Sequence, residues 1–240
     1  MATYVLVHGG GHGGWCYSRV APLLRRQGHD VYAPTLTGLG ERSHLLGPDV
    51  DLDTHITDVV NVLHYEDLTD SILVGHSYGG MVITGAADRA PERVGQLVYL
   101  DGALPENGEA LAEIAPAVVD AQRESGRVVD GVEVVLWPEP DGAGRRYGVT
   151  DPAELAWMQE RLTPHPWRSF TQPLRLADAD AVRRIPRTNI NCVETLSRRP
   201  PERQARASDA DRVWEIDTGH DLMITEPQIV AEMLLRLADL

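Results

Sequence analysis

The feature that most restricts the fold of this chain is a serine flanked by glycines between an apolar run and a helical pattern. Residues 72–74 have the length and composition of a buried strand, and Gly75-His76-Ser77-Tyr78-Gly79 follows them directly. Glycines at both ends allow so sharp a turn, because side chains there would collide across the bend. A helix beginning behind Ser77 aims its N–H groups and positive dipole end at negative charge developing beside the serine. The pattern predicts a strand–turn–helix unit that exposes Ser77 as a nucleophile above a sheet, in preference to a plain glycine-rich turn.

Short apolar runs alternate with helical patterns along most of the chain. This alternation is typical of an α/β fold with a mostly parallel, doubly wound sheet, here of about six strands. The helix at residues 53–66 would be capped by Asp53 or Thr54. We expect strands at residues 3–8, 30–33, 71–75, 96–101, 188–193 and 212–217. We expect the other helices at residues 15–27, 81–89 and 226–240.

Residues 105–186 break this rhythm, since they are rich in proline, glycine, aspartate and arginine. Neighbouring strands of a parallel sheet need no connection of this length. We therefore predict that residues 1–104 and 187–240 form the core, and that residues 105–186 form a lid inserted after the fourth strand.

The predicted lid contains a hairpin signal and several aromatic residues. Apolar runs at residues 127–129 and 132–136 flank Asp130-Gly131, a pair typical of a tight hairpin turn. The aromatic residues either pack lid helices together or line an acyl pocket: Trp137, Trp157, Trp167 and Phe170.

The charge and composition exclude several kinds of partner. The formal net charge is −14 at pH 7, whereas nucleic acids and anionic membranes are bound by basic patches. All 22 basic residues are arginine, which excludes Schiff-base chemistry on lysine. No apolar run could span a bilayer and no signal segment precedes the first strand, so we expect a cytoplasmic protein. Cys16 and Cys192 are too few for a disulfide framework or a zinc site, and the sequence leaves a homodimer open.

A serine hydroxyl needs a base, and the chain has nine histidines from which position must choose. His220 follows the last predicted strand, so its loop lies at the same edge of the sheet as Ser77. We therefore predict that His220 is the base. His76 lies in the turn itself, but strand alternation would direct its side chain away from Ser77. The remaining loop histidines are expected to be solvated: His29, His44, His55 and His165.

The base should be oriented by a carboxylate, for which the sequence offers two candidates. Asp101 ends the strand beside the serine strand, and Glu194 follows the next strand. Both loops could reach His220. We favour Asp101, because a carboxylate that closes so apolar a strand needs a charged or hydrogen-bonding partner.

A tetrahedral oxyanion needs two preorganised N–H donors. One donor is predicted to be the N–H of Tyr78, directly after the serine. The other is predicted to be the N–H of Gly10, in the glycine loop at residues 8–15.

The glycine loop also fits G-x-G-x-x-G at Gly9, Gly11 and Gly14. A dinucleotide site would require an acidic residue at the end of the second strand, and the residues there carry no carboxylate. His8 and His12 resemble a metal pair, but no third ligand is suggested nearby. We therefore expect no cofactor and no metal.

Together, the glycine loop, the segment from Gly75 to Gly80 and Asp217-Thr218-Gly219-His220 resemble the α/β-hydrolase superfamily. The resemblance is closest to the branch of plant methyl-ester esterases and hydroxynitrile lyases. It implies a compact sheet, a small lid and no cofactor. It also implies a triad of Ser77, His220 and a carboxylate, with the N–H groups of Gly10 and Tyr78 as oxyanion donors.

Two departures from that branch bear on the activity. The lyases carry a threonine after the loop histidine and a lysine after the catalytic histidine, where this chain has Gly9 and Asp221. A lysine would stabilise departing cyanide and an aspartate would oppose it, so the esterase side is favoured. The plant branch also places an aspartate where this chain has Glu194-Thr195, which is a further reason to consider Asp101.

These observations predict a serine hydrolase that cleaves a small or medium carboxylic ester, lactone or thioester through an acyl-enzyme on Ser77. Two alternatives remain. The same fold could carry out an elimination, cyclisation or C–C cleavage of a biosynthetic intermediate with His220 as base. It could also serve as a receptor-like binding module with vestigial turnover.

Overall fold

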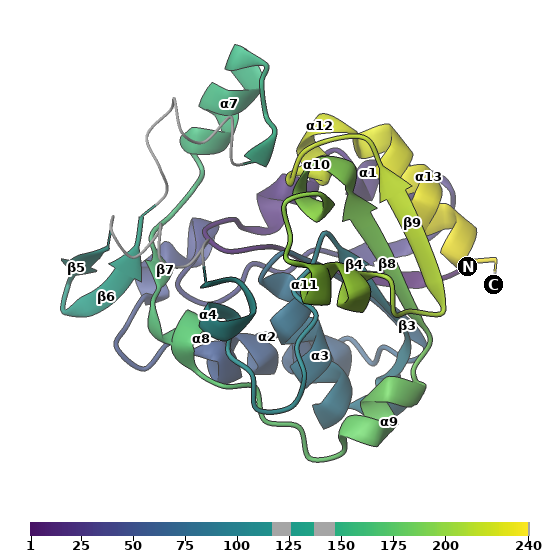
Figure 1. Cartoon of the computed structure of the whole chain (residues 1–240), viewed down its shortest axis with the longest axis horizontal. Coiled ribbons are helices and arrows are strands. Elements are labelled where there is room, and N and C mark those ends of the chain that lie inside the picture. The colour runs from purple at the N-terminus through teal and green to yellow at the C-terminus, as the bar shows by residue number, and fades with distance from the viewer. Residues whose placement is uncertain (117–125, 137–146, 240) are drawn as a thin grey trace.

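The computed structural model describes residues 1–116, 126–136 and 147–239 (Figure 1). Its centre is a six-stranded sheet with the order β2-β1-β3-β4-β8-β9, in which every neighbouring pair is parallel. The predicted fold class is therefore confirmed, and no end of the six strands differs from prediction by more than two residues. The strands are β1 (Thr3–Val7), β2 (Asp30–Tyr32), β3 (Ser71–His76), β4 (Val94–Leu100), β8 (Arg187–Cys192) and β9 (Arg212–Ile216).

Alternate residues of the strands enter two separate apolar layers. In β1, Tyr4 and Leu6 join one buried cluster, whereas Val5 and Val7 join the other. This two-residue period arises because successive side chains of a strand point to opposite faces. Helices cover both faces (Figure 1): α1 (Ala21–Arg26) and α13 (Pro227–Leu237) lie on the first, and α2 (Leu52–Tyr65) and α3 (Gly79–Arg89) on the second.

Two predicted helices differ in detail from the structure. The segment at residues 15–27 is divided into a short 3-10 helix, η1 (Gly14–Tyr17), and α1, with Pro22 in the first turn of α1 where its missing N–H costs nothing. The predicted cap of α2 is wrong. Asp51 is the cap, and it accepts a hydrogen bond from Thr54 N at 3.0 Å.

Between β4 and β8 the chain forms a second, smaller sheet and several short helices. The predicted hairpin is present as β5 (Arg127–Val129) and β6 (Val132–Val135), and β7 (His165–Pro166) extends it. Its turn residues Asp130 and Gly131 have φ values of 50° and 81°, as such tight turns require. The division into core and lid itself remains a prediction.

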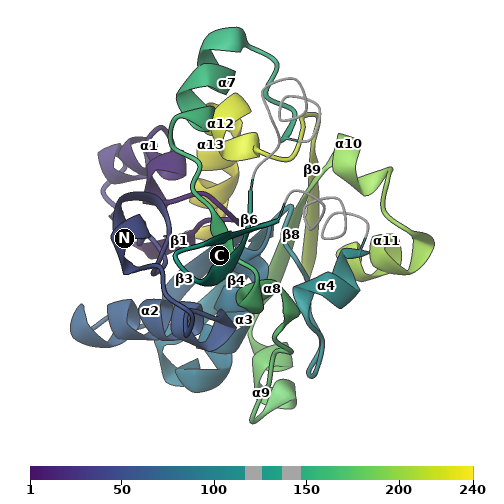
Figure 2. The ribbon, with the colours of Figure 1, turned by 90° about the vertical axis from the view of Figure 1, so that its left-hand side faces the viewer.

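The remaining helices border the carboxyl edge of the large sheet or join its strands. These helices are η2 (Gly40–Leu45), η3 (Pro91–Arg93), α4 (Leu111–Ile114), α7 (Pro152–Gln159), α8 (Arg168–Thr171), α9 (Ala179–Arg184), α10 (Val193–Leu196), α11 (Pro201–Ala207) and α12 (Leu222–Thr225). In Figures 1 and 2, α4 lies beside α11, and Arg203 of α11 donates to the Glu113 carbonyl at 3.3 Å. Within the described ranges, no helix has both the length and the apolar character to cross a membrane.

The aromatic residues predicted in the lid have different surroundings. The Trp157 ring lies edge-on to Trp15, with centroids 5.2 Å apart, so it packs against η1. Phe170 lies 5.4 Å from the ring of Tyr78, directly behind the serine turn, and Trp167 lies 6.4 Å from Phe170. Trp137 lies outside the described residues.

Candidate active site

The turn after β3 places Ser77 at the carboxyl edge of the sheet. Ser77 has a left-handed backbone with φ of 52°, an unusual conformation for a residue with a side chain. A Cβ at Gly75 would lie 2.6 Å from the Gly79 carbonyl oxygen, and a Cβ at Gly79 would lie 2.6 Å from the Val7 carbonyl oxygen. Both glycines are therefore required by close backbone approach, which is the steric reason that the sequence suggested.

His220 reaches Ser77 from the loop between β9 and α12. Its Nε2 lies 2.9 Å from Ser77 Oγ, and its Nδ1 lies 2.5 Å from Asp101 Oδ2. The carboxylate only accepts, so the ring proton lies on Nδ1 and Nε2 is free to accept the serine proton. The structure thus brings Ser77, His220 and Asp101 into one hydrogen-bonded row.

The Asp101 carboxylate is fully buried and has three further partners. Thr195 Oγ1 donates to Oδ2 at 2.7 Å, Arg199 Nη2 donates to Oδ1 at 2.6 Å, and Cys192 N donates to Oδ1 at 3.4 Å. Burial would raise the pKa of Asp101, but the hydrogen bond and charge of His220 and the charge of Arg199 lower it to about 2. The group is therefore an anion at neutral pH.

Glu194, the alternative carboxylate, has a different environment. Its side chain is 50% exposed, and its ion pair is with Arg198 at 3.8 Å, one helical turn further along. The structure therefore places Asp101, and not Glu194, beside His220.

The glycine loop lies against the serine turn. A Cβ at Gly9 would lie 2.9 Å from Ser77 Cβ and 2.8 Å from His76 Nδ1, so no side chain fits there. In the described part of the chain, the N–H groups of Gly10 and Tyr78 donate no hydrogen bond to the protein. Neither N–H group is therefore committed to another acceptor in that part of the chain.

His8 fixes the direction of the Gly10 N–H group. Leu36 N donates to His8 Nε2 at 3.0 Å, so the ring proton lies on Nδ1, which donates to the Gly9 carbonyl at 2.8 Å. Since the peptide is trans, holding the Gly9 carbonyl also directs the Gly10 N–H to the opposite side. Burial lowers the pKa of His8 to about 3, so the ring is neutral.

His12 and Asp221 form a buried ion pair behind this loop. His12 Nδ1 donates to the Gly10 carbonyl at 2.9 Å, and Nε2 donates to Asp221 Oδ2 at 3.1 Å. Burial favours the neutral ring, but the Asp221 carboxylate and the Gly10 carbonyl raise the pKa of His12 above its usual value. Burial likewise opposes ionisation of Asp221, but His12 lowers its pKa. The pair joins the glycine loop to the loop that carries His220.

Three histidines that the sequence set aside lie at the site. His76 was expected to be directed away from Ser77, but its ring lies 4.7 Å from that of His220 and its Nε2 donates to the His220 carbonyl at 2.9 Å. His55 and His165 were expected to be solvated, and this was wrong because both are fully buried. A sequence signal existed for His55, which shares the apolar face of α2 with Ile56.

His55 and His165 both contact residues of the site. Tyr78 Oη donates to His55 Nδ1 at 2.8 Å, since His55 Nε2 faces the Thr37 carbonyl at 2.9 Å and carries the ring proton. His165, in β7, accepts from Gly11 N at 3.2 Å. Thr163 N donates to the Gly11 carbonyl at 2.9 Å, so this segment holds both polar groups of Gly11.

One set of potential metal ligands overlaps the row of Ser77, His220 and Asp101. Among the described residues, His76, His220 and Asp221 have ligand atoms within 4.8 Å of one another. Both ring nitrogens of His220 already face hydrogen-bonding partners, so a bound ion would have to displace Ser77 or Asp101. This arrangement favours a proton relay at His220 over metal ligation.

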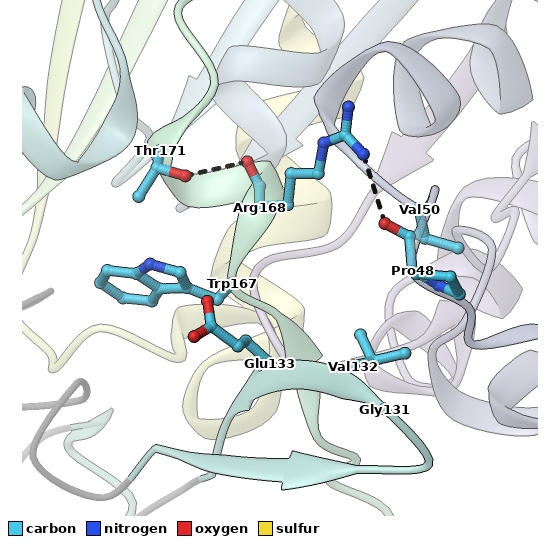
Figure 3. Close-up of a pocket in the computed structure, with 8 residues that line it drawn as sticks. All are labelled: Pro48, Val50, Gly131, Val132, Glu133, Trp167, Arg168 and Thr171. Atoms are coloured by element: carbon cyan, nitrogen blue, oxygen red, sulfur yellow. Dashed lines mark hydrogen bonds between the residues drawn. The ribbon is translucent and has the colours of Figure 1, made fainter.

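A groove of about 370 Å³ lies between the hairpin of β5 and β6 and helix α8 (Figure 3). Arg168 crosses one side of it and donates to the Pro48 carbonyl at 3.3 Å. Ser77 and His220 do not line it. Its lining residues are Pro48, Val50, Gly131, Val132, Glu133, Trp167, Arg168 and Thr171.

Comparisons with known proteins extend over the whole chain. The profile of the alpha/beta hydrolase family matches residues 4–233. A carbendazim hydrolyzing esterase of Nocardioides sp. (strain SG-4G) is 37% identical, with 99% of this chain and 100% of the relative aligned. Methylesterase 9 of Arabidopsis thaliana is 28% identical, with 100% and 99% aligned. The crystal structure of a methylesterase protein from Arabidopsis matches with a TM-score of 0.79 at 23% identity, covering 100% of this chain and 99% of the other.

Proposed function

The chain belongs to the alpha/beta hydrolase family, on its esterase branch, and we propose that it hydrolyses a small or medium carboxylic ester through an acyl-enzyme on Ser77. The observation that carries the proposal is the row of hydrogen bonds from Ser77 Oγ through His220 to Asp101, at 2.9 and 2.5 Å. The backbone N–H groups of Gly10 and Tyr78 lie beside it without partners among the described residues.

In the first half of the reaction, Ser77 Oγ attacks the ester carbonyl and passes its proton to His220 Nε2. Asp101 stabilises the imidazolium that forms and keeps the other ring proton on Nδ1. The oxygen of the tetrahedral intermediate accepts from the N–H groups of Gly10 and Tyr78. Each such donor contributes about 3–4 kcal/mol to stabilising the transition state in related chemistry.

In the second half, His220 Nε2–H protonates the departing alkoxide, and the alcohol leaves. A water molecule then gives a proton to His220 and attacks the acyl carbonyl. The second tetrahedral intermediate collapses to release the carboxylic acid and return the proton to Ser77. No cofactor is required for these steps.

The relatives and the site favour particular substrates. Two of the named relatives are methylesterases, which supports an ester with a small alcohol group. Lactones and thioesters undergo the same acyl transfer and remain within the proposal. The residue after His220 is Asp221, whose carboxylate pairs with His12, and not a lysine that could stabilise departing cyanide. This disfavours the hydroxynitrile lyase reaction.

The test uses a fluorophosphonate and two simple esters, p-nitrophenyl acetate and butyrate. We expect the phosphonate to label the wild-type protein, and we expect ester turnover to be lost in Ser77→Ala. Ser43→Ala, which removes an exposed serine in η2, should label and turn over as the wild type does. Labelling without turnover of any ester would favour a non-hydrolytic reaction with His220 as base. Absence of both would favour a binding module.

A further inference from the structure

The carboxylate beside His220 is shared with an arginine. Arg199 lies on the connection between α10 and α11, and its Nη2 donates to Asp101 Oδ1 at 2.6 Å and to the Asp101 carbonyl at 3.4 Å. The opposite oxygen, Oδ2, faces His220 Nδ1 at 2.5 Å. A guanidinium therefore stands on the far side of the same carboxylate that would stabilise protonated His220.

The connection after β8 supplies partners for the acid and not the acid itself. The resemblance to the plant esterases would place the acid on this connection, but its only nearby carboxylate, Glu194, faces solvent and Arg198. The connection instead supplies two donors to Asp101, namely Thr195 Oγ1 at 2.7 Å and Arg199 Nη2. It therefore holds an acid that comes from β4.

We propose that Arg199 is a positioning residue that lowers the affinity of His220 for a proton while fixing the Asp101 carboxylate toward it. The proposal rests on the esterase function proposed above. Asp101 attracts a proton to His220, whereas the arginine charge repels it and neutralises part of the carboxylate. The imidazole thus stays unprotonated, and able to act as a base, to a lower pH than an unshared aspartate would allow.

Among the residues that the structure describes, the other groups around His220 supply no comparable fixed cation. His76 is neutral because burial and the neighbouring His220 lower its pKa to about 3. Both ring nitrogens of His12 face acceptors, which favours the protonated ring, but the Asp221 carboxylate offsets that charge at 3.1 Å. Burial raises the pKa of the Cys192 thiol, so it is uncharged. Within the described ranges, the titratable groups that contact His220 are Asp101, Ser77, His76 and Tyr147, whose ring lies 6.4 Å away. One contact further out, Arg199 and the backbone of Cys192 bind Asp101, and His12 binds Asp221.

The decisive measurement is the pH dependence of kcat/KM, whose acid limb reports the base of the free enzyme. In Arg199→Gln, which keeps a hydrogen-bond donor but removes the charge, we expect the acid limb to move to higher pH by about 1 unit. Arg199→Lys keeps the charge, so we expect a shift in the same direction of less than about half that size. If Arg199→Gln does not fold, Arg199→Met gives the same test with an apolar stem of similar length.

Two control variants separate charge from structure. Arg198→Gln removes the same unit of charge from the neighbouring residue, whose side chain is 67% exposed and pairs with Glu194, so its acid limb should not move. Thr195→Val removes an uncharged donor from Asp101 Oδ2, so it should shift the limb less than Arg199→Gln does.

A second readout does not depend on turnover. Titration of the His220 imidazole by NMR in isotopically labelled protein should show the same upward shift in Arg199→Gln. An unmoved titration, or an equal shift in Arg198→Gln, would overturn the role of Arg199. If the wild-type protein hydrolysed no ester but the His220 titration still moved to higher pH in Arg199→Gln, the proposed function would be refuted and the electrostatic role of Arg199 would remain supported.

Discussion

Different kinds of contact hold the two sides of His220: the inner side, formed by the glycine loop and the serine turn, and the acid side, formed by Asp101 and its partners. On the inner side, the glycine loop and the serine turn are held by buried histidines, and His8 and His76 act there as neutral rings with fixed tautomers. On the acid side, Asp101 is held by the cation Arg199, whose side chain is 21% exposed. Neutral contacts fix where atoms lie, whereas a charge also changes how tightly His220 binds a proton.

This difference has a physical consequence for each side. A histidine that must accept from an N–H group, as His8 does from Leu36, loses that contact when it is protonated. The inner side is therefore rigid at neutral pH and vulnerable to acid. The acid side keeps its contacts over a wide pH range, because the pKa of Asp101 is lowered to about 2 and arginine stays charged.

The largest expected effect is on the acid side. Replacing Asp101 with asparagine keeps the shape of the side chain, but it allows the wrong His220 tautomer and removes the charge that stabilises the imidazolium. We expect kcat to fall by about 10⁴-fold. Steady-state turnover of p-nitrophenyl butyrate near neutral pH measures this loss.

The matched control is Glu194→Gln, which removes the carboxylate on the neighbouring connection. Glu194 contacts Arg198 and not His220, so kcat should stay within about twofold of wild type. A large loss in Glu194→Gln combined with a mild loss in Asp101→Asn would reverse the assignment of the acid.

A second prediction concerns the buried pair of His12 and Asp221 on the inner side. Asp221→Asn leaves the buried His12 without its counter-ion, and we expect the free energy of unfolding to fall by about 3–5 kcal/mol. Asp180→Asn, which removes the partner of the exposed Arg183, should cost no more than about 1 kcal/mol. Urea denaturation of both variants provides the comparison.

The double variant His12→Gln/Asp221→Asn tests whether charge is the cause. It replaces the ion pair with two neutral groups that can still hydrogen-bond, so it should recover part of the stability lost in Asp221→Asn. If it is less stable than Asp221→Asn alone, the histidine contributes through packing and the interpretation as an ion pair is wrong.

The sequence predicted the parallel sheet and the turn around Ser77 better than it predicted the side chains that hold the two sides of His220. Predicted apolar strands of about four to six residues, separated by helical patterns, determine a parallel sheet, and a parallel sheet brings Ser77 and the loop of His220 to one edge. The turn around Ser77 was also predictable, because close backbone approach at Gly75 and Gly79 leaves little choice of residue.

The partners of the site could not be predicted in the same way. His12 and Asp221 are separated by 209 positions, and His165 and Gly11 by 154, so no local spacing connects them. Whether a histidine is solvated or buried depends on which remote segment covers it, and the segment that covers Gly11 lies in the least regular part of the chain. Arg199 gave no signal at all, since a single arginine among 22 basic residues is ordinary.

A third prediction follows from the buried neutral histidines. The pKa of His8 and of His76 is about 3 in the folded protein, against 6.5 ordinarily. Below the ordinary value the unfolded chain binds protons that the folded protein does not, so stability is complete above it and is lost as the pH falls. Each histidine should remove about 1.4 kcal/mol of unfolding free energy per pH unit below its ordinary pKa.

Urea unfolding at about pH 7.5, 6 and 5 measures this slope. His8→Asn carries no titrating ring at this position, so its slope should be smaller than that of wild type. His12 contributes with the opposite sign because its pKa is raised, and it therefore offsets part of the total. Stability that stays constant across this range would show that the inner side does not depend on neutral histidines.

The smallest effect is expected where the inner side meets the segment between β4 and β8. His165→Phe removes the acceptor for Gly11 N but leaves the Thr163 N contact to the Gly11 carbonyl. The free energy of unfolding should fall by about 1–3 kcal/mol, the cost of an unsatisfied buried N–H. Activity should fall less than in Asp101→Asn, because His8 and His12 still hold the carbonyls of Gly9 and Gly10. If His165→Phe reduced kcat as strongly as Asp101→Asn while the protein stayed folded, the direction of the Gly10 N–H would depend on this segment more than on His8. The distinction between a self-contained inner side and an adjustable acid side would then have to be abandoned.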